Sequence, residues 1–170
     1  MKSTPAHISL NICINSLRFA LALVFVFSGF VKAIDPMGTV YKMADYADAF
    51  GIGVSPFWLL TGAGILIVVE YVMGVSLFFG LYRRFYLWSM IAFLAVMTPL
   101  TLFLALTNPI SDCGCFGDAW VLSNWETFAK NVILLTMAIV VFRWRKLIFR
   151  FFTEKTDWLV SLFTSNYNSE

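Results

Sequence analysis

The residues in this sequence whose types and spacing could do chemistry are two cysteines in the segment DCGCFG, Asp112 to Gly117. One glycine separates Cys113 from Cys115. Bridged cysteines hold their Cα atoms about 4.4 to 6.8 Å apart, which residues two apart reach only in a turn. Gly114 permits such a turn. Because strained, exposed disulfides tend to be labile or catalytic, the spacing favours thiol–disulfide redox chemistry over a structural staple.

Other interpretations of the pair stay open: a small closed loop without turnover, a site for a soft metal such as Cu(I), or two reduced thiols without a role. Asp112 and Phe116 flank the cysteines and are predicted as supporting residues of the redox pair. A closed metal site needs more ligands, and the only histidine, His7, lies far along the chain, so we expect no metal. Cys13 is interpreted as a packed small hydrophobic residue.

The elements that must position these cysteines are membrane helices. Apolar residues make up 60% of the 170 residues and charged residues 13%, a composition typical of membrane proteins. The balance of 12 Lys and Arg against 10 Asp and Glu is too small to indicate a nucleic-acid partner. Stretches long enough to cross a lipid bilayer cover residues 16–34, 57–81, 85–106 and 124–142. The sequence therefore predicts one membrane domain over residues 1–170, an all-α bundle of four transmembrane helices.

Local signals mark where these helices begin. Asp35 and Pro36 are typical of an N-cap and a first helical residue. They predict the start of a short amphipathic segment, residues 36–50, that would lie at the membrane surface. Ser123 and Glu126 form a capping-box pattern before the fourth span. The first span is interpreted as an uncleaved helix rather than a signal peptide, because Lys32 lies where a cleavage region prefers small neutral residues.

The Lys and Arg residues predict the orientation. They flank the first span, form the second connection and follow the fourth span, at Lys2, Arg18, Arg83, Arg84, Arg143, Arg145, Lys146 and Arg150. By the positive-inside rule these places are cytoplasmic, together with both termini and the tail over residues 143–170. The cysteine loop has no Lys or Arg, so we expect it on the periplasmic side of a bacterial inner membrane, with the amphipathic segment.

Ionisable residues within the spans are costly and often functional. Glu70 lies roughly 16 Å from the cytoplasmic end of the second span, near the midplane, so it must be protonated or paired. Lys32 is a candidate partner or a snorkelling side chain, and its position near the outer end of the first span argues against a direct pair. Two roles for Glu70 stay open: a neutral group hydrogen-bonded between helices, or a proton relay or ligand site.

Lys130 and Asn131 lie about two turns into the fourth span, on the side of the cysteines. Glu126 precedes Lys130 by four residues, so the two can pair along the helix. A lysine near Cys113 or Cys115 would lower the pKa of a thiol and favour the thiolate. Snorkelling to the headgroups is the simpler interpretation of Lys130.

Four stretches carry a family resemblance: FSGFVKAIDP, EYVMGVSLFFGLYRR, DCGCFGDA and WETFAKNVILL. Together they resemble the DoxX-like membrane proteins, and especially the branch similar to the methylamine-utilisation protein MauE. The resemblance implies a four-helix inner-membrane protein. MauE-like members are thought to assist maturation of the disulfide-rich small subunit of methylamine dehydrogenase, and DoxX-like members are associated with quinone-linked sulfur oxidation.

Two classes of function follow. In the first, Cys113 and Cys115 exchange disulfides with a periplasmic thioredoxin-like protein or a disulfide-containing client, and electrons pass to or from a quinone held between the helices. The quinone comes from the analogy with other four-helix membrane thiol oxidoreductases. In the second, the protein is a noncatalytic scaffold or transport subunit, such as a DoxX-like subunit of a respiratory complex, and the C-x-C only shapes a loop.

Overall fold

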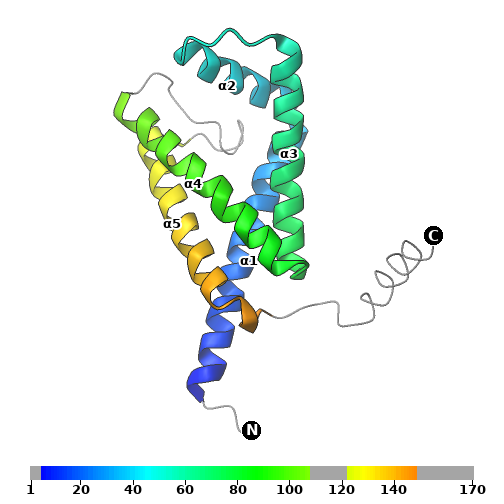
Figure 1. Cartoon of the computed structure of the whole chain (residues 1–170), viewed down its shortest axis with the longest axis vertical. Helices are drawn as coiled ribbons and strands as arrows, with labels where there is room; N and C mark the ends of the chain where they lie inside the picture. The colour runs from blue at the N-terminus through cyan, green and yellow to red at the C-terminus, as the bar shows by residue number, and fades with distance from the viewer. Residues whose placement is uncertain (1–4, 108–121, 149–170) are drawn as a thin grey trace, which may run out of the picture.

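The computed structural model describes residues 5–107 and 122–148, and every regular element in that part of the chain is a helix (Figure 1). This confirms the predicted all-α fold. In chain order the elements are α1 (Pro5–Ile34), α2 (Pro36–Ala49), α3 (Pro56–Phe79), α4 (Arg83–Thr107), α5 (Asn124–Arg143) and the short 3-10 helix η1 (Arg145–Leu147).

Four of these helices, α1, α3, α4 and α5, are long and apolar enough to cross a membrane. Large apolar side chains cover their outer faces and are more than half exposed, for example Leu23, Ile65, Val96 and Ile133. Contiguous apolar surface of this extent is not stable in water, whereas lipid tails solvate it. The chain is therefore a multi-pass membrane protein, as the four apolar stretches predict.

The predicted capping signals begin the helices where they were expected. The Ser123 hydroxyl accepts the Glu126 N–H, and the Glu126 carboxylate accepts the Ser123 N–H at 2.9 Å, so the capping box is complete. The Asp35 carboxylate accepts the Gly38 N–H at 2.9 Å and starts α2. The first helix is longer than the predicted span: α1 begins at Pro5, and its apolar span begins at Ser9 rather than near residue 16. Arg18, predicted to flank this span, is therefore a buried residue inside it.

The bundle consists of two helix pairs that share one end. Helix α1 packs along α3, and α4 packs along α5, whereas contacts between α3 and α4 are far fewer. The two pairs meet at the end that contains the α3–α4 turn, called the narrow end below, and they diverge toward the opposite, wide end (Figure 1). Helix α2 crosses the wide end and packs against α3.

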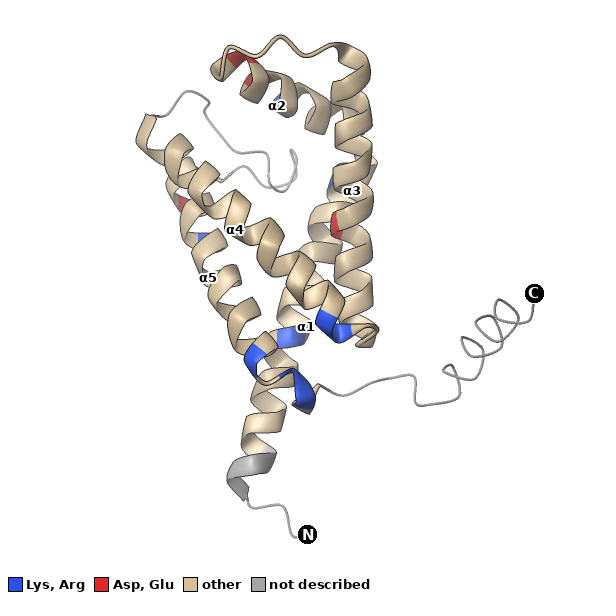
Figure 2. Cartoon of the chain, in the orientation of Figure 1, with Lys and Arg blue, Asp and Glu red and all other residues tan. Residues whose placement is uncertain are grey.

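Polar contacts hold the narrow end together. Gly80 ends α3 in a left-handed conformation with φ of 72°, which glycine adopts without strain. The Asn15 amide donates to the Leu147 carbonyl at 3.2 Å, and the Arg83 guanidinium donates to the Ile148 carbonyl at 3.4 Å. Most of the described Lys and Arg residues gather at this end, whereas Lys32, Lys42 and Lys130 lie at the cavity and the acidic residues lie toward the wide end (Figure 2).

Two glycines bring the backbones of α1 and α3 into direct contact. A Cβ atom added at Gly74 would lie 2.6 Å from the Val26 backbone nitrogen, and one added at Gly29 would lie 2.8 Å from the Tyr71 backbone nitrogen. Small residues at such crossings let membrane helices approach closely and gain packing energy that lipid cannot supply. The α1–α3 pair is therefore a close helix pair whose separation these two glycines set.

This close approach predicts a difference between two glycine substitutions in the same helix. We expect Gly74→Ala to destabilise the protein by about 1–3 kcal/mol, because its new methyl group meets backbone that cannot move aside without separating the helices. Gly64→Ala should leave stability unchanged or slightly raised, since nothing lies within 4 Å of its added Cβ. Unfolding midpoints in detergent measure both, and equal midpoints would contradict a tight α1–α3 crossing.

The charge distribution also predicts the orientation in the membrane. Both ends of the chain and the α3–α4 turn should be cytoplasmic, because most of the described Lys and Arg residues gather at the narrow end (Figure 2). A phosphatase reporter, active only outside the cytoplasm, should be inactive when fused after Glu170 and active when inserted near Ser111. The reverse pattern would place the cysteine segment in the reducing compartment.

Candidate functional site

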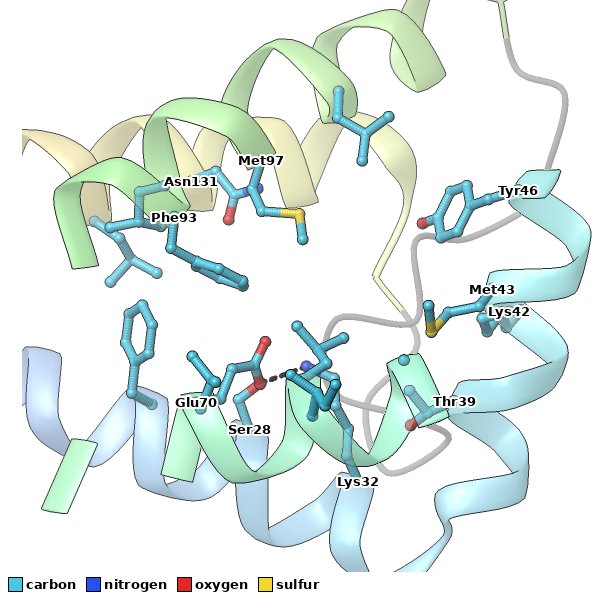
Figure 3. A pocket seen from close by; sticks show the side chains of 18 of the residues that line it. Ser28, Lys32, Thr39, Lys42, Met43, Tyr46, Glu70, Phe93, Met97 and Asn131 are labelled. Atoms are coloured by element: carbon cyan, nitrogen blue, oxygen red, sulfur yellow. Dashed lines mark hydrogen bonds and ion pairs between the residues drawn. The ribbon is translucent and has the colours of Figure 1, made fainter. Parts of the chain in front are cut away.

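Three polar side chains from α1 and α3 form a buried cluster in the middle of the bundle. The Lys32 ammonium lies 2.6 Å from Glu70 Oε2, and the Ser28 hydroxyl donates to the same oxygen at 2.8 Å (Figure 3). Lys32 also donates to Ser28 Oγ at 3.0 Å. Lys32 and Glu70 are only 5% and 4% exposed, so the pair is shielded from solvent and its two charges neutralise each other.

The local sequence explains why these side chains meet. Ser28 and Lys32 are four residues apart and therefore share one face of α1. Gly29 lies on the close crossing, where it faces Tyr71, the residue after Glu70. Because the backbones approach so closely there, a short Ser and an extended Lys both reach the same carboxylate oxygen.

The expectation that depth prevents a direct Lys32–Glu70 pair is wrong. Lys32 is two residues from the end of α1, whereas Glu70 is well inside α3, which begins at Pro56. At 1.5 Å per residue, the pairing requires α3 to extend roughly 18 Å beyond the last turn of α1. The helix ends are thus not level, and α2 occupies the space above the end of α1 (Figure 1).

The ion pair forms part of the wall of a cavity of about 490 Å³, to which all five α-helices contribute side chains. Most of the wall is apolar, and its aliphatic and aromatic residues include Val24, Leu66, Phe93, Leu94, Met97, Leu100 and Leu134 (Figure 3). The volume falls in the range of about 300–1,000 Å³ that is typical of small-molecule sites. A largely apolar cavity with a few convergent polar groups is the arrangement expected of a ligand-binding site.

Asn131 presents a second polar group to the cavity from α5. The Thr101 hydroxyl donates to backbone carbonyls of α4, with the Met97 oxygen at 2.9 Å, so its own oxygen is left to accept from the Asn131 amide at 3.3 Å. This contact fixes the orientation of the amide and directs Asn131 Oδ1 into the cavity (Figure 3).

Helix α2 closes the wide end of the cavity. The Phe50 ring stacks on the Phe103 ring of α4 with centroids 5.4 Å apart, and Met43 lies over Gly62 of α3, where an added Cβ would meet its terminal methyl at 2.9 Å. Thr39 lines the cavity and is 5% exposed, and its hydroxyl has no hydrogen-bond partner within the described residues. A buried hydroxyl of this kind is costly to leave unpaired.

The predicted redox residues Cys113 and Cys115, with Asp112, Gly114 and Phe116, lie outside the described residues. The helices that carry this segment are described: α4 ends at Thr107 and α5 begins at Asn124, both at the wide end (Figure 1). The cysteine segment thus joins the bundle at the same end as α2, which agrees with the predicted grouping of these two segments. Cys13 is a free, exposed cysteine near the narrow end, so the prediction that it is packed in the core is wrong.

Lys130 and Asn131, predicted as supporting residues, both line the cavity. The Glu126 carboxylate receives the hydroxyl and N–H of Ser123, at 2.7 and 2.9 Å, as part of the helix cap. The Lys130–Glu126 pairing stays a prediction. Lys42 of α2 also lines the cavity, and it shares this feature with Lys32 and Lys130.

Sequence reasoning missed four polar side chains that line the cavity, namely Ser28, Thr39, Lys42 and Tyr46. It also missed the Thr101 hydroxyl that orients Asn131. The i, i+4 spacing of Ser28 and Lys32 on one helix face could have signalled a shared partner. Thr39 gave no signal, because a threonine in an amphipathic helix is ordinary until the packing of that helix is known.

These features define a multi-pass α-helical membrane protein with a mainly apolar cavity and an ion pair buried in its wall. The chain matches the family model of the methylamine utilisation protein MauE over residues 10–143, which spans α1 to the end of α5. It therefore belongs to the MauE family. Searches of the curated proteins and of the solved structures gave no match.

The buried pair predicts a non-additive effect of mutations. Lys32→Met or Glu70→Met alone leaves one buried ionisable group without its partner, and we expect each to lower stability by about 3–5 kcal/mol. The double variant should recover most of this loss, because no charge then remains in the apolar interior. Unfolding midpoints of the four proteins in detergent measure the coupling, and a double variant as unstable as the sum of both single variants would contradict it.

Proposed function

We propose that this protein is a membrane thiol–disulfide oxidoreductase that assists the maturation of an extracytoplasmic partner. Cys113 and Cys115 exchange disulfides with a thioredoxin-like protein or with a disulfide-containing client. Membership of the MauE family supports a role in methylamine utilisation. The resemblance to MauE-like proteins implies one client in particular, the disulfide-rich small subunit of methylamine dehydrogenase. A DoxX-like link to quinones would supply the electron acceptor.

The observation that carries this proposal is the distance between the cavity and the helix ends that flank the cysteines. Leu100 and Lys130 line the cavity, and each is seven residues from a flanking position, Thr107 or Ser123. Seven helical residues span about 10 Å. The helix ends that flank this segment thus lie close to a cavity that can hold a lipid-soluble ligand, and this supports a redox role for the cysteines between them.

The proposed reaction balances in two steps. A client thiolate attacks the Cys113–Cys115 disulfide, a mixed disulfide forms, and the second client thiol displaces it, so the client gains the S–S bond and the pair becomes a dithiol. The dithiol then re-forms its own S–S bond and loses two electrons and two protons. A membrane quinone takes up both electrons and both protons and leaves as the quinol.

This reaction predicts the effects of cysteine substitutions in intact cells. Cys113→Ser and Cys115→Ser should each abolish client disulfide formation, because both the attacking and the resolving sulfur are needed to open and re-form the bridge. One of the two variants should accumulate a mixed disulfide with its partner, visible as a higher band on a non-reducing gel that reductant removes. Gly114→Val should slow closure of the bridge, since a β-branched residue resists the required turn.

Cys13→Ser is the matched control, because it removes a thiol near the narrow end and should leave client maturation unchanged. Thiol trapping should show the outer pair cycling between dithiol and disulfide as growth conditions change. If both outer cysteines can be replaced without loss of client maturation, the noncatalytic scaffold takes the place of this proposal.

A further inference from the structure

We propose that the cavity binds the ring of a membrane quinone, with its oxygens at the Lys32–Glu70 pair, Asn131 and Thr39. This inference rests on the proposed function, because it assigns a site to the acceptor that thiol oxidation requires. The site is built from side chains of α1, α2, α3 and α5, and its binding can be measured without any turnover of the cysteines.

The cavity wall has both hydrogen-bond acceptors and hydrogen-bond donors that no protein group uses within the described residues. Glu70 Oε2 receives both Lys32 and Ser28, whereas Oε1 makes no hydrogen bond within the described part of the chain and points into the cavity (Figure 3). Asn131 Oδ1 is a second acceptor. The Lys32 ammonium has three N–H donors, of which Ser28 and Glu70 use two, and the Thr39 hydroxyl can donate or accept.

A mixed set of donors and acceptors selects the chemical class of the ligand. Quinone carbonyls only accept, and they would be met by Lys32 and Thr39, whereas the hydroxyls of the quinol also donate, and they would be met by Glu70 Oε1 and Asn131 Oδ1. A carboxylate or phosphate head group has no proton to donate to Glu70 Oε1, whereas a quinol hydroxyl does. A neutral ring that converts between carbonyl and hydroxyl groups uses all four side chains over its redox cycle.

Lys42 and Lys130 also line the cavity, and each already has an interaction of its own. The pair at the centre of the site carries no net charge, because Lys32 and Glu70 neutralise each other. The apolar wall around them, which Leu66, Leu94 and Leu134 help to form, suits a hydrocarbon ring with an isoprenoid tail rather than a hydrated ion.

The cavity reaches the lipid-facing surface of the bundle. Ile65 and Val69 of α3 line it and are 60% and 42% exposed. In a membrane-spanning helix such exposed apolar residues face lipid tails. Because these lining residues face the bilayer, a lipid-soluble ring can approach the cavity from the lipid tails without crossing water.

The inference is tested by binding of tritiated ubiquinone-1 to the purified full-length protein in nanodiscs. The binding experiment uses the Cys113→Ser/Cys115→Ser background, so it does not depend on thiol chemistry. Asn131→Leu and Thr39→Val should each raise the Kd about 3- to 10-fold, the range expected for the loss of one buried hydrogen bond. Thr136→Val is the matched control and should not change the Kd, because its hydroxyl lies on the exposed face of α5 and bonds to the Val132 carbonyl.

A second variant tests the cavity itself. Met97→Trp adds a large ring at the cavity wall and should abolish saturable ubiquinone-1 binding while the unfolding midpoint shows that the protein is folded. Saturable binding that Asn131→Leu, Thr39→Val and Met97→Trp leave unchanged would place the quinone elsewhere and overturn the inference. Displacement of ubiquinone-1 by oleate at equal concentration would also overturn it, because the site would then select only for an apolar chain.

The two proposals fail in different ways. If wild-type protein does not bind ubiquinone-1 but the cysteine variants still abolish client oxidation, the quinone site is wrong and the thiol chemistry stands. If ubiquinone-1 binds with the predicted losses in the variants but the cysteines are dispensable, the site stands and the proposed oxidoreductase function is wrong.

Discussion

The arrangement of this bundle depends on one constraint: an ionised side chain placed inside the membrane must find its partner within the protein. Lys32 and Glu70 meet this constraint by forming a direct pair, with Ser28 satisfying the same carboxylate oxygen. The pair requires α1 and α3 to approach closely, which Gly29 and Gly74 permit. It also requires α3 to extend well beyond the end of α1, and this offset creates the space that α2 covers.

The cavity follows from that offset together with the pairing of the helices. Close packing fixes α1 on α3, and α4 packs on α5 as a second unit, so the two pairs share only the narrow end. At the wide end α2 lies between them, held to α4 by the Phe50–Phe103 stack and to α3 by Met43 over Gly62. Because α2 fills the top of the gap and not its middle, an apolar space remains beside the ion pair.

The sequence predicts the features that depend on neighbouring residues, such as the spans and the caps of the helices. Hydropathy indicated the four spans, and the caps at Asp35 and Ser123 begin their helices as expected. Lys32 was a candidate partner of Glu70, but depth argued against direct contact because all helix ends were treated as level. The sequence did not single out Thr39, because a hydroxyl becomes informative only once tertiary packing leaves it buried and unpaired. Asn131 was noted for its position, but its orientation depends on Thr101 of another helix.

The Lys32–Glu70 ion pair has two roles: it stabilises the packing of α1 on α3, and it forms part of the cavity wall. Removing either charge exposes the other to an apolar interior, so a loss of activity would follow from unfolding as readily as from a lost ligand contact. Asn131 and Thr39 are different: neither carries a charge, and both line the cavity. Their neutrality lets chemistry at the cavity be separated from the stability of the bundle. A ligand that bonds to Glu70 Oε1 would in turn stabilise the folded bundle, so binding and folding are linked at this one carboxylate.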